Sequence, residues 1–261
     1  MAHLFIFGLG YSAKRIRAAA EACGWQVSAT GSEGELAFED EDAVRAALAS
    51  ARHVLSSVPP DDSGDPVLAR YGDALGHFWL GYLSSTGVYG DAGGAWVDET
   101  APVGGGRRSA RMDADAAWLE RRARVFRLPG IYGPGRSALD GVAERRAHRI
   151  DLPAQVFSRV HVDDIAAGVI AGLEAPPGAY NLADDLPASQ NAVIAEACNL
   201  LGVEPPPLQT LEEAGLSPQA RAFYAENRRV ANGKAKRVLG WRPQFPTYRE
   251  GLRAIVRPTS P

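Results

Sequence analysis

A short apolar run followed directly by two glycines constrains this chain more than any other segment. Residues 4–7 (LFIF) are typical of a strand buried on both faces, as in a parallel sheet, and residues 14–23, rich in Ala, Arg and Glu, favour a helix. Between them, Gly8, Gly10 and Ala13 match the spacing G-x-G-x-x-G/A. This spacing indicates a dinucleotide site, because small residues allow backbone N–H groups to approach a pyrophosphate. Glycine turns also end strands in proteins that bind no nucleotide, so this interpretation depends on the rest of the chain.

Composition excludes several classes of protein. With 261 residues and 46% apolar content, the chain can bury the core of one domain, or of a large domain with a smaller lobe. Its formal charge is −3 with both signs interspersed, which gives no reason to expect nucleic acid or a membrane surface as a partner. No apolar stretch is long enough to span a bilayer, and the first strand begins too early to leave room for a signal peptide. We therefore expect a cytoplasmic protein. Neither cysteine has a second ligand nearby, and we predict no metal site.

The order of predicted elements indicates an α/β fold. Strand-like segments alternate with helical ones, which favours βαβ units and a parallel sheet. We predict strands at 25–30, 52–58, 78–84, 124–134, 156–162 and 178–182, and helices at 42–50, 67–75 and 108–122. The predicted architecture is a Rossmann-type doubly wound parallel sheet over residues 1–132, to which residues 157–182 return. A smaller substrate-side and helical region covers residues 133–261.

The end of the second predicted strand is where dinucleotide folds choose between NAD and NADP. Thr30 and Ser32 stand there, and the missing acid favours NADP modestly, although no arginine is present to bind a 2′-phosphate. Lys14 or Arg15 could supply that charge. Asp40 could reach an adenine or could cap the next helix, and capping is the favoured role. The candidate cofactor-binding residues in the first three strands and their turns are Gly8, Gly10, Tyr11, Ala13, Thr30, Ser32 and Ser57.

A second informative stretch is LSSTGVYGD at residues 83–91. Its hydroxyls, at Ser84, Ser85 and Thr86, follow a buried strand and would lie beside a nicotinamide if the first turn held the pyrophosphate. They could equally be small polar residues that end a strand. The glycine-rich residues 93–106 are predicted to form an ordered loop over the site, and Asp163 or Asp164 to cap a helix that runs to residue 173.

Four stretches in order resemble the extended and atypical short-chain dehydrogenase/reductases, the superfamily of nucleotide-sugar epimerases and dehydratases. They are GLGYSA at 8–13, SSTGVYGD at 84–91, RLPGIYGPG at 127–135 and RVHVDDIA at 159–166. The resemblance covers roughly the first two thirds of the chain. The tail, GWRPQFPTYREGL at 240–252, resembles a small subgroup of atypical members whose reactions are mostly unassigned.

The resemblance implies NAD(P) as cofactor, with Pro129 beside the nicotinamide and Ser85 as the hydroxyl that polarises a substrate; Thr86 is the reserve candidate. It also implies a Tyr-x-x-x-Lys pair, whose phenol transfers the proton that accompanies hydride transfer. Here Arg107 aligns with the tyrosine and Arg111 with the lysine. An arginine does not give up its proton near neutral pH. Arg111 could still hold the ribose and Arg107 an anionic substrate.

Two classes of function follow from this pattern. The first is an NAD(P)-dependent oxidoreductase, or an epimerase/dehydratase-like enzyme, acting on a small polar substrate such as a nucleotide sugar or a carbonyl compound, with Tyr132 or Tyr89 as the missing acid. The second is a sensor or structural protein that binds NADP(H) and has lost catalysis. We favour the enzyme, because residues 84–106 look built to receive a substrate. Relatives often pair through two helices, so a homodimer could form through those near 67–75 and 108–122.

Overall fold

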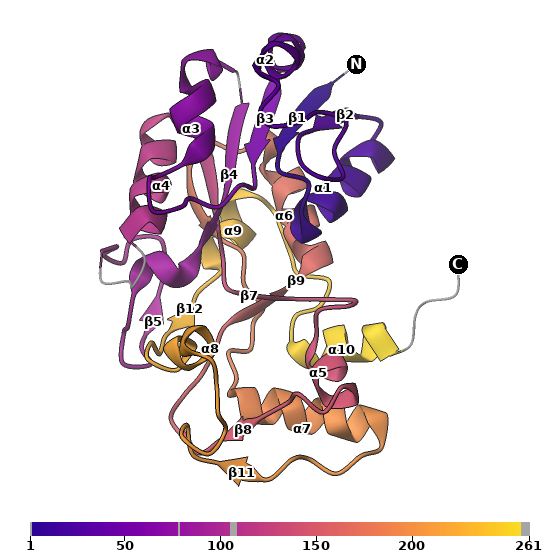
Figure 1. The fold of residues 1–261 in the computed structure, drawn as a ribbon, viewed down its shortest axis with the longest axis vertical. Coiled ribbons are helices and arrows are strands. Elements are labelled where there is room, and N and C mark those ends of the chain that lie inside the picture. Colours follow the sequence, from indigo (N-terminus) through magenta and orange to yellow (C-terminus); the bar gives the residue numbers. More distant parts are fainter. Residues whose placement is uncertain (1, 78, 105–108, 257–261) are drawn as a thin grey trace.

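The computed structural model describes residues 2–77, 79–104 and 109–256. Its main sheet has six parallel strands in the order β10-β6-β4-β3-β1-β2 (Figure 1). The strands are β1 (His3–Phe7), β2 (Gln26–Ala29), β3 (His53–Ser56), β4 (Trp79–Ser85), β6 (Arg124–Leu128) and β10 (Gly178–Asn181). Strand β2 lies on one side of β1, and β3 and the strands after it lie on the other side, so the strand order reverses between β1 and β3. Open α/β sheets bind ligands at the carboxyl ends of the strands at such a switch point. The predicted doubly wound parallel sheet is confirmed.

The burial of β1 explains its uninterrupted apolar sequence. Leu4 and Ile6 pack into the core on one face of the sheet, and Phe5 and Phe7 pack into the core on the other. All four side chains are fully buried. A strand that lies in the middle of a two-sided sheet has no face for polar residues, so the period-2 alternation of an exposed strand is absent.

Helices cover both faces of the sheet (Figure 1). One face carries α1 (Tyr11–Ala22) and α6 (Val162–Ala171), and the other carries α2 (Glu41–Ser50), α3 (Pro66–Tyr71) and α4 (Ser109–Glu120). The short 3-10 helices η1 (Gly72–Ala74), η2 (Thr86–Tyr89) and η3 (Gly172–Glu174) follow α3, β4 and α6. Asp40 caps α2, since its Oδ1 accepts a hydrogen bond from Ala43 N at 3.1 Å, as predicted. Among the described helices, none has the length and apolar character needed to cross a membrane.

A second, smaller group of elements lies beyond the carboxyl ends of the sheet strands (Figure 1). A core that includes Tyr132, Leu139, Val193, Tyr248 and Leu252 holds this region together. Its elements are β7 (Gly130–Tyr132), α5 (Ala138–Ala143), β8 (Arg149–Ile150), β9 (Arg159–His161), α7 (Gln190–Leu201), β11 (Leu208–Gln209), α8 (Pro218–Phe223) and α10 (Tyr248–Val256). Strands β7 and β9 pair in parallel outside the main sheet, whereas β10 joins it. The predicted domain boundaries remain a prediction.

The start of α6 differs from the prediction. Neither Asp163 nor Asp164 caps the helix, because Nδ1 of His161 accepts the hydrogen bond from Asp163 N at 3.2 Å. Asp164 is 1% exposed and accepts hydrogen bonds from the backbone N–H groups of Gln244 and Phe245. This carboxyl group therefore fastens the tail of the chain to α6.

The glycine-rich segment after η2 also differs from the prediction. Residues 96–97 form β5 (Trp96–Val97), which pairs with β12 (Arg229–Val230), the strand before α9 (Gly233–Val238). No residue from 93 to 104 lines the large cavity of the molecule, and residues 105 and 106 lie outside the described chain. In its described part, the segment therefore pairs with the C-terminal part of the chain through β5 and β12 and does not lie over the cavity.

Candidate functional site

The glycine turn after β1 is held by three hydrogen bonds. Gly8 has φ of +81°, a conformation that favours glycine, and its N–H donates to Thr30 Oγ1 at 3.1 Å. Leu9 N donates to Thr30 O at 2.9 Å, and Ser57 Oγ donates to Gly8 O. A Cβ atom at Gly8 would lie 3.0 Å from Val58 Cγ2. Thr30 and Ser57 therefore shape the turn from the neighbouring strands β2 and β3.

Gly10 differs from Gly8 because its missing side chain leaves open space. A Cβ atom built at Gly10 would meet nothing within 4 Å, and Gly10 lines the large cavity together with Tyr11, Ser12 and Ala13. Gly10 is the N-cap of α1 and offers no side chain to the first N–H groups of the helix. Such N–H groups are free to bind an anion. The residues at this position fit the pyrophosphate of a dinucleotide, and Ala13, 1% exposed, packs in the core.

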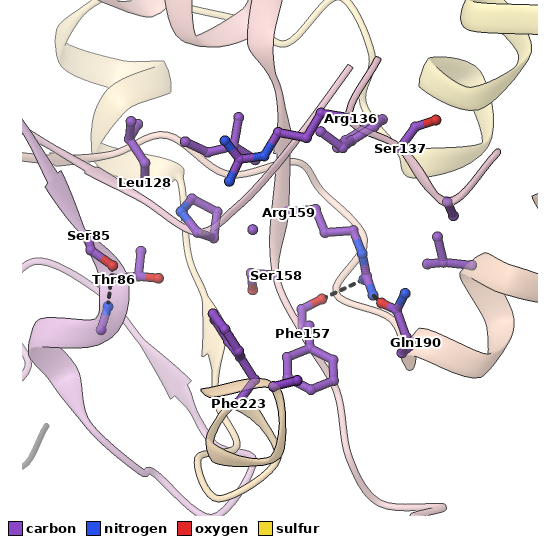
Figure 2. Close-up of a pocket in the computed structure, with 18 of the residues that line it drawn as sticks. Ser85, Thr86, Leu128, Arg136, Ser137, Phe157, Ser158, Arg159, Gln190 and Phe223 are labelled. Carbon is purple, nitrogen blue, oxygen red and sulfur yellow. Dashed lines mark hydrogen bonds between the residues drawn. The ribbon is translucent and has the colours of Figure 1, made fainter. Parts of the chain in front are cut away.

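A cavity of about 1570 Å³ extends from α1 into the smaller region. The carboxyl ends of three sheet strands open into it, through Ser57, Ser85 and Pro129. Thr86 and Arg111 line it as well. Figure 2 shows Ser85 and Thr86 on one side of the cavity and Arg159 and Gln190 across from them. The structure thus brings most of the predicted cofactor and catalytic residues to one wall.

The hydroxyl of Ser85 is oriented by the backbone. Ser85 Oγ accepts a hydrogen bond from Gly87 N at 3.1 Å and thereby caps η2. Its own hydrogen remains free to be donated to an oxygen atom in the cavity. Thr86 is 4% exposed and contributes less of its side chain to the cavity wall.

Arg111, which is predicted to align with the family lysine, lines the cavity and contacts a tyrosine. Arg111 Nη1 donates a hydrogen bond to Tyr82 OH at 3.3 Å. Tyr82 is fully buried on β4 and stacks on Trp118, and burial raises its pKa to about 12. Tyr82 does not line the cavity, so this phenol is not within reach of a ligand there. Arg107, the predicted ligand of an anionic substrate, lies outside the described residues.

The two tyrosines predicted as alternative acids are both engaged in packing. Tyr132 lines the cavity, but its hydroxyl is buried against Gly251 of α10 and has no hydrogen-bond partner among the described residues. Burial raises the pKa of Tyr132. Tyr89 donates to Asn181 Oδ1 at 2.8 Å and accepts from Arg127 Nη1 at 3.0 Å, away from the cavity. These surroundings favour structural roles for both, and their part in catalysis stays a prediction.

The residues predicted to contact the adenosine part of the cofactor lie outside the cavity. Thr30 and Ser32 do not line the cavity, and Ser32 is exposed in the turn that follows β2. The two predicted partners of a 2′-phosphate are already paired with carboxylates. Lys14 forms an ion pair with Glu33, and Arg15 lies 3.4 Å from Asp163. Both pairs are solvent-exposed, and such pairs contribute little stability and are readily exchanged.

The structure adds residues that the sequence analysis did not select. Arg136, directly after the turn at residues 133–135, lines the cavity and lies over the ring of Tyr11 at 5.7 Å. The sequence does offer a signal for Arg136, because it follows a glycine turn at the end of a predicted strand, where α/β sheets bind ligands. Arg159 and Phe223 also line the cavity, from β9 and α8. Arg159 lies in the stretch RVHVDDIA at 159–166, but that pattern assigns it no role, and nothing in the sequence distinguishes Phe223 from a surface residue.

No metal site is evident in the described part of the chain: no three His, Cys, Asp or Glu side chains there lie close enough together to hold an ion.

Comparison with known proteins finds sequence relatives and solved structures that share the fold of this chain. No family model matches it. A functionally unknown conserved protein from Silicibacter pomeroyi is 40% identical, with a TM-score of 0.88 over 98% of each chain. A 3-diazoavenalumate denitrifying reductase from Streptomyces is 32% identical over 158 residues, which is 56% of this chain and 51% of the reductase. The chain thus spans about half the length of that relative.

More distant solved structures share the fold alone. The dTDP-glucose 4,6-dehydratase from Bacillus anthracis, in complex with NAD, has a TM-score of 0.77 at 14% identity, over 98% of this chain and 96% of that one. The human epimerase family protein SDR39U1, with NADPH, has a TM-score of 0.76 at 16% identity, over 98% and 99%. The two proteins hold different nicotinamide cofactors.

Proposed function

We propose that the chain, which shares the fold of extended short-chain dehydrogenase/reductases, is a member of that superfamily and acts as an NAD(P)-dependent oxidoreductase or epimerase/dehydratase-like enzyme on a small polar substrate. One observation carries the proposal. A single cavity has the open position at Gly10 and the start of α1 at one end, Ser85 and Pro129 along its wall, and the smaller region beyond them. A cofactor and a substrate can therefore meet there.

The residues of this chain have separate tasks in the proposed enzyme. Gly10 and the first N–H groups of α1 would hold the pyrophosphate, and Pro129 would contact the nicotinamide. The cofactor, when bound, would supply the hydride chemistry. Ser85, whose Oγ is held by Gly87 N, donates its hydrogen to the substrate oxygen and so orients the carbonyl or alcohol. Arg111, on the same wall, binds the ribose.

A second function, an NADP(H)-binding sensor, is favoured by the surroundings of Arg111. A guanidinium bonded to the buried Tyr82 cannot lower the pKa of a phenol in the cavity in the way that the family lysine does. Four tyrosines of the described chain line the cavity: Tyr11, whose hydroxyl donates to Pro134 O at 3.1 Å, Tyr132, whose hydroxyl is buried, Tyr224 and Tyr248. Tyr248 is 2% exposed, and Tyr224 packs edge to face on Phe157. The proton donor of an enzyme would then be Tyr224, a water molecule or a group supplied by the substrate.

Cofactor binding is tested by titrating NADPH into the protein and following nucleotide fluorescence. We expect saturable binding by the wild type and its loss in Gly10→Asp, because the new carboxylate would occupy the space for the pyrophosphate and repel it. The matched control is Gly76→Asp, another exposed glycine whose Cβ would meet nothing within 4 Å and which lies outside the cavity. Absence of saturable binding, or equal binding by both variants, would contradict the site.

Enzyme and sensor are separated by turnover. Carbonyl compounds are screened for oxidation of NADPH by absorbance, and nucleotide sugars for conversion to a new product by chromatography, because an epimerase or dehydratase returns the hydride and consumes no cofactor overall. Turnover in either screen that requires one substrate and stops in Gly10→Asp supports the enzyme. Tight NADPH binding without turnover on any member of the screen supports the sensor.

A further inference from the structure

Arg159 is a buried cation without a counter-ion. It lies on β9, lines the cavity and is 7% exposed. Its guanidinium donates to Phe157 O at 2.8 Å, Ala188 O at 2.9 Å and Gln190 Oε1 at 3.0 Å (Figure 2). All three acceptors are neutral. Within the described chain no carboxylate lies within ion-pair distance of Arg159, although burying a charge without a partner is costly.

The hydrogen bonds of Arg159 leave donors available toward the cavity. An arginine has five N–H donors, and the three bonds use only Nη1 and one hydrogen of Nη2. Nε of Arg159 has no acceptor in the described part of the chain and is not sealed from solvent, in contrast to Nε of Arg149, which is buried and unpaired. In a guanidinium group, Nε–H and an Nη2–H on the same edge form the side-on fork that binds a carboxylate with two parallel hydrogen bonds.

The acidic groups nearest to this arginine do not neutralise it. Asp184, whose N–H donates to Arg159 O at 2.7 Å, is 2% exposed, and burial raises its pKa to about 8. Burial thus opposes the charged form of Asp184, and its carboxylate does not lie within ion-pair distance of Arg159 in the described structure. Among the lining residues described, only Asp140 and Glu226 are acidic. Asp140 is used by Ser137 in a capping box, and Glu226 pairs with Arg228 at 2.7 Å.

Aromatic side chains lie beside Arg159. The ring of Phe157 meets that of Tyr224 edge to face at 5.6 Å, and both line the cavity. Phe223 of α8 lines it too and is 60% exposed, which is unusual for a side chain with no polar group. Figure 2 places Phe157 and Phe223 close together below Ser158 and Arg159. A ligand ring in this position would cover the exposed face of Phe223.

From this juxtaposition we propose that the substrate is an aromatic carboxylic acid, whose carboxylate is bound by Arg159 and whose ring packs on Phe157 and Phe223. The proposal names the substrate class of the cavity and thus rests on the function proposed above. Gln190, which accepts from Nη2, is a positioning residue that fixes the plane of the guanidinium.

The test measures binding without turnover. Protein saturated with NADP⁺ is titrated with 3-phenylpropanoate by calorimetry, with 3-phenylpropanamide as the uncharged probe and hexanoate as the acid without a ring. We expect 3-phenylpropanoate to bind at least tenfold more tightly than either of the others. Equal binding of the amide would overturn the role of the charge, and equal binding of hexanoate would overturn the role of the ring.

Variants assign the two contacts to residues. Arg159→Lys keeps the charge but removes the fork, and we expect binding to weaken at least tenfold. The matched control is Arg124→Lys, a buried strand arginine that donates to Ala175 O and lies outside the cavity. Phe223→Asp, at an exposed position that does not threaten the fold, should weaken binding at least tenfold by repelling the anion. Leu208→Asp, 50% exposed and outside the cavity, should not.

NADPH binding, measured on the same preparations, separates this proposal from the previous one. If the wild type shows no saturable binding of NADPH, the proposed function is contradicted. Saturable NADPH binding without binding of 3-phenylpropanoate, or with binding that Phe223→Asp leaves unchanged, overturns the aromatic acid alone.

Discussion

Asp115 of α4 and Arg127 of β6 form an ion pair inside the protein, with Asp115 Oδ1 2.6 Å from Arg127 Nη2 and neither side chain more than 3% exposed. Ser84 Oγ donates to the other carboxylate oxygen, Oδ2, at 2.6 Å, and Arg127 also donates to Tyr89 OH. These bonds connect α4, β4 and β6 at Ser84, the residue before Ser85. Ser84 lines the cavity, whereas Asp115 and Arg127 do not, so an ion pair outside the cavity helps to hold its hydroxyl-bearing wall.

We expect Asp115→Asn to destabilise the protein by about 3–5 kcal/mol, because Arg127 would remain buried without a counter-charge. Urea unfolding gives the free energy of unfolding of the wild type and the variant. The control is Asp113→Asn, an exposed carboxylate on the same helix, which should change stability by less than about 0.5 kcal/mol. A similar small loss in both variants would mean that the buried pair does not hold this part of the fold.

Much of the sheet could be predicted from the sequence because strand signals are local. The run at residues 4–7 and the turn at Gly8 and Gly10 depend only on nearby residues, and each lies where it was predicted. The cap of α6 was predicted wrongly, because Asp164 bonds to backbone groups about 80 residues further along the chain. Whether the charge of Arg159 is paired depends on where the fold brings Asp184, in the loop after β10, and Gln190, the first residue of α7, and no local pattern encodes that.

Ser85→Ala should lower kcat/KM at least tenfold on any substrate found, because the variant loses the hydroxyl that orients the substrate. The Kd for NADPH should stay unchanged, since the glycine turn is not affected. Thr86→Val is the comparison, because Thr86 lies next in the chain, is 4% exposed and keeps its volume on substitution. Steady-state kinetics and NADPH titration of both variants check this. A normal rate in Ser85→Ala with a reduced rate in Thr86→Val would transfer the role to Thr86.

Lys14 is expected to give a modest preference for NADPH over NADH. Its ammonium pairs with the exposed Glu33, and a 2′-phosphate carries more charge than this carboxylate and could replace it. We predict that Lys14→Ala weakens NADPH binding about tenfold, which is about 1.4 kcal/mol, and leaves NADH binding unchanged. Lys236→Ala, another lysine in an ion pair, is the control and should alter neither affinity. If Lys14→Ala affects both cofactors equally, the preference has another origin.

Asp184 should make the protein less stable as the pH rises. Its carboxyl is 2% exposed, Oδ2 has no partner in the described structure, and burial raises its pKa to about 8 against the opposing charge of Arg159. Asp185 and Asp164 add to the rise. In the unfolded chain an aspartate has a pKa of about 3.9. The folded state therefore binds more protons than the unfolded state between about pH 4 and about pH 8, and the free energy of unfolding falls across this window.

The variant Asp184→Asn is uncharged in both states, so it should lose this dependence. Urea unfolding at about pH 5 and about pH 8 should show that the wild type loses on the order of several kcal/mol more than the variant over this interval. Asp151→Asn, at an exposed position, should keep the wild-type slope because its carboxylate is solvated in both states. Parallel curves for Asp184→Asn and the wild type would mean that Asp184 is ionised in the folded protein at neutral pH. Arg159 would then have a charged neighbour, and its attraction for an anion in the cavity would be correspondingly weaker.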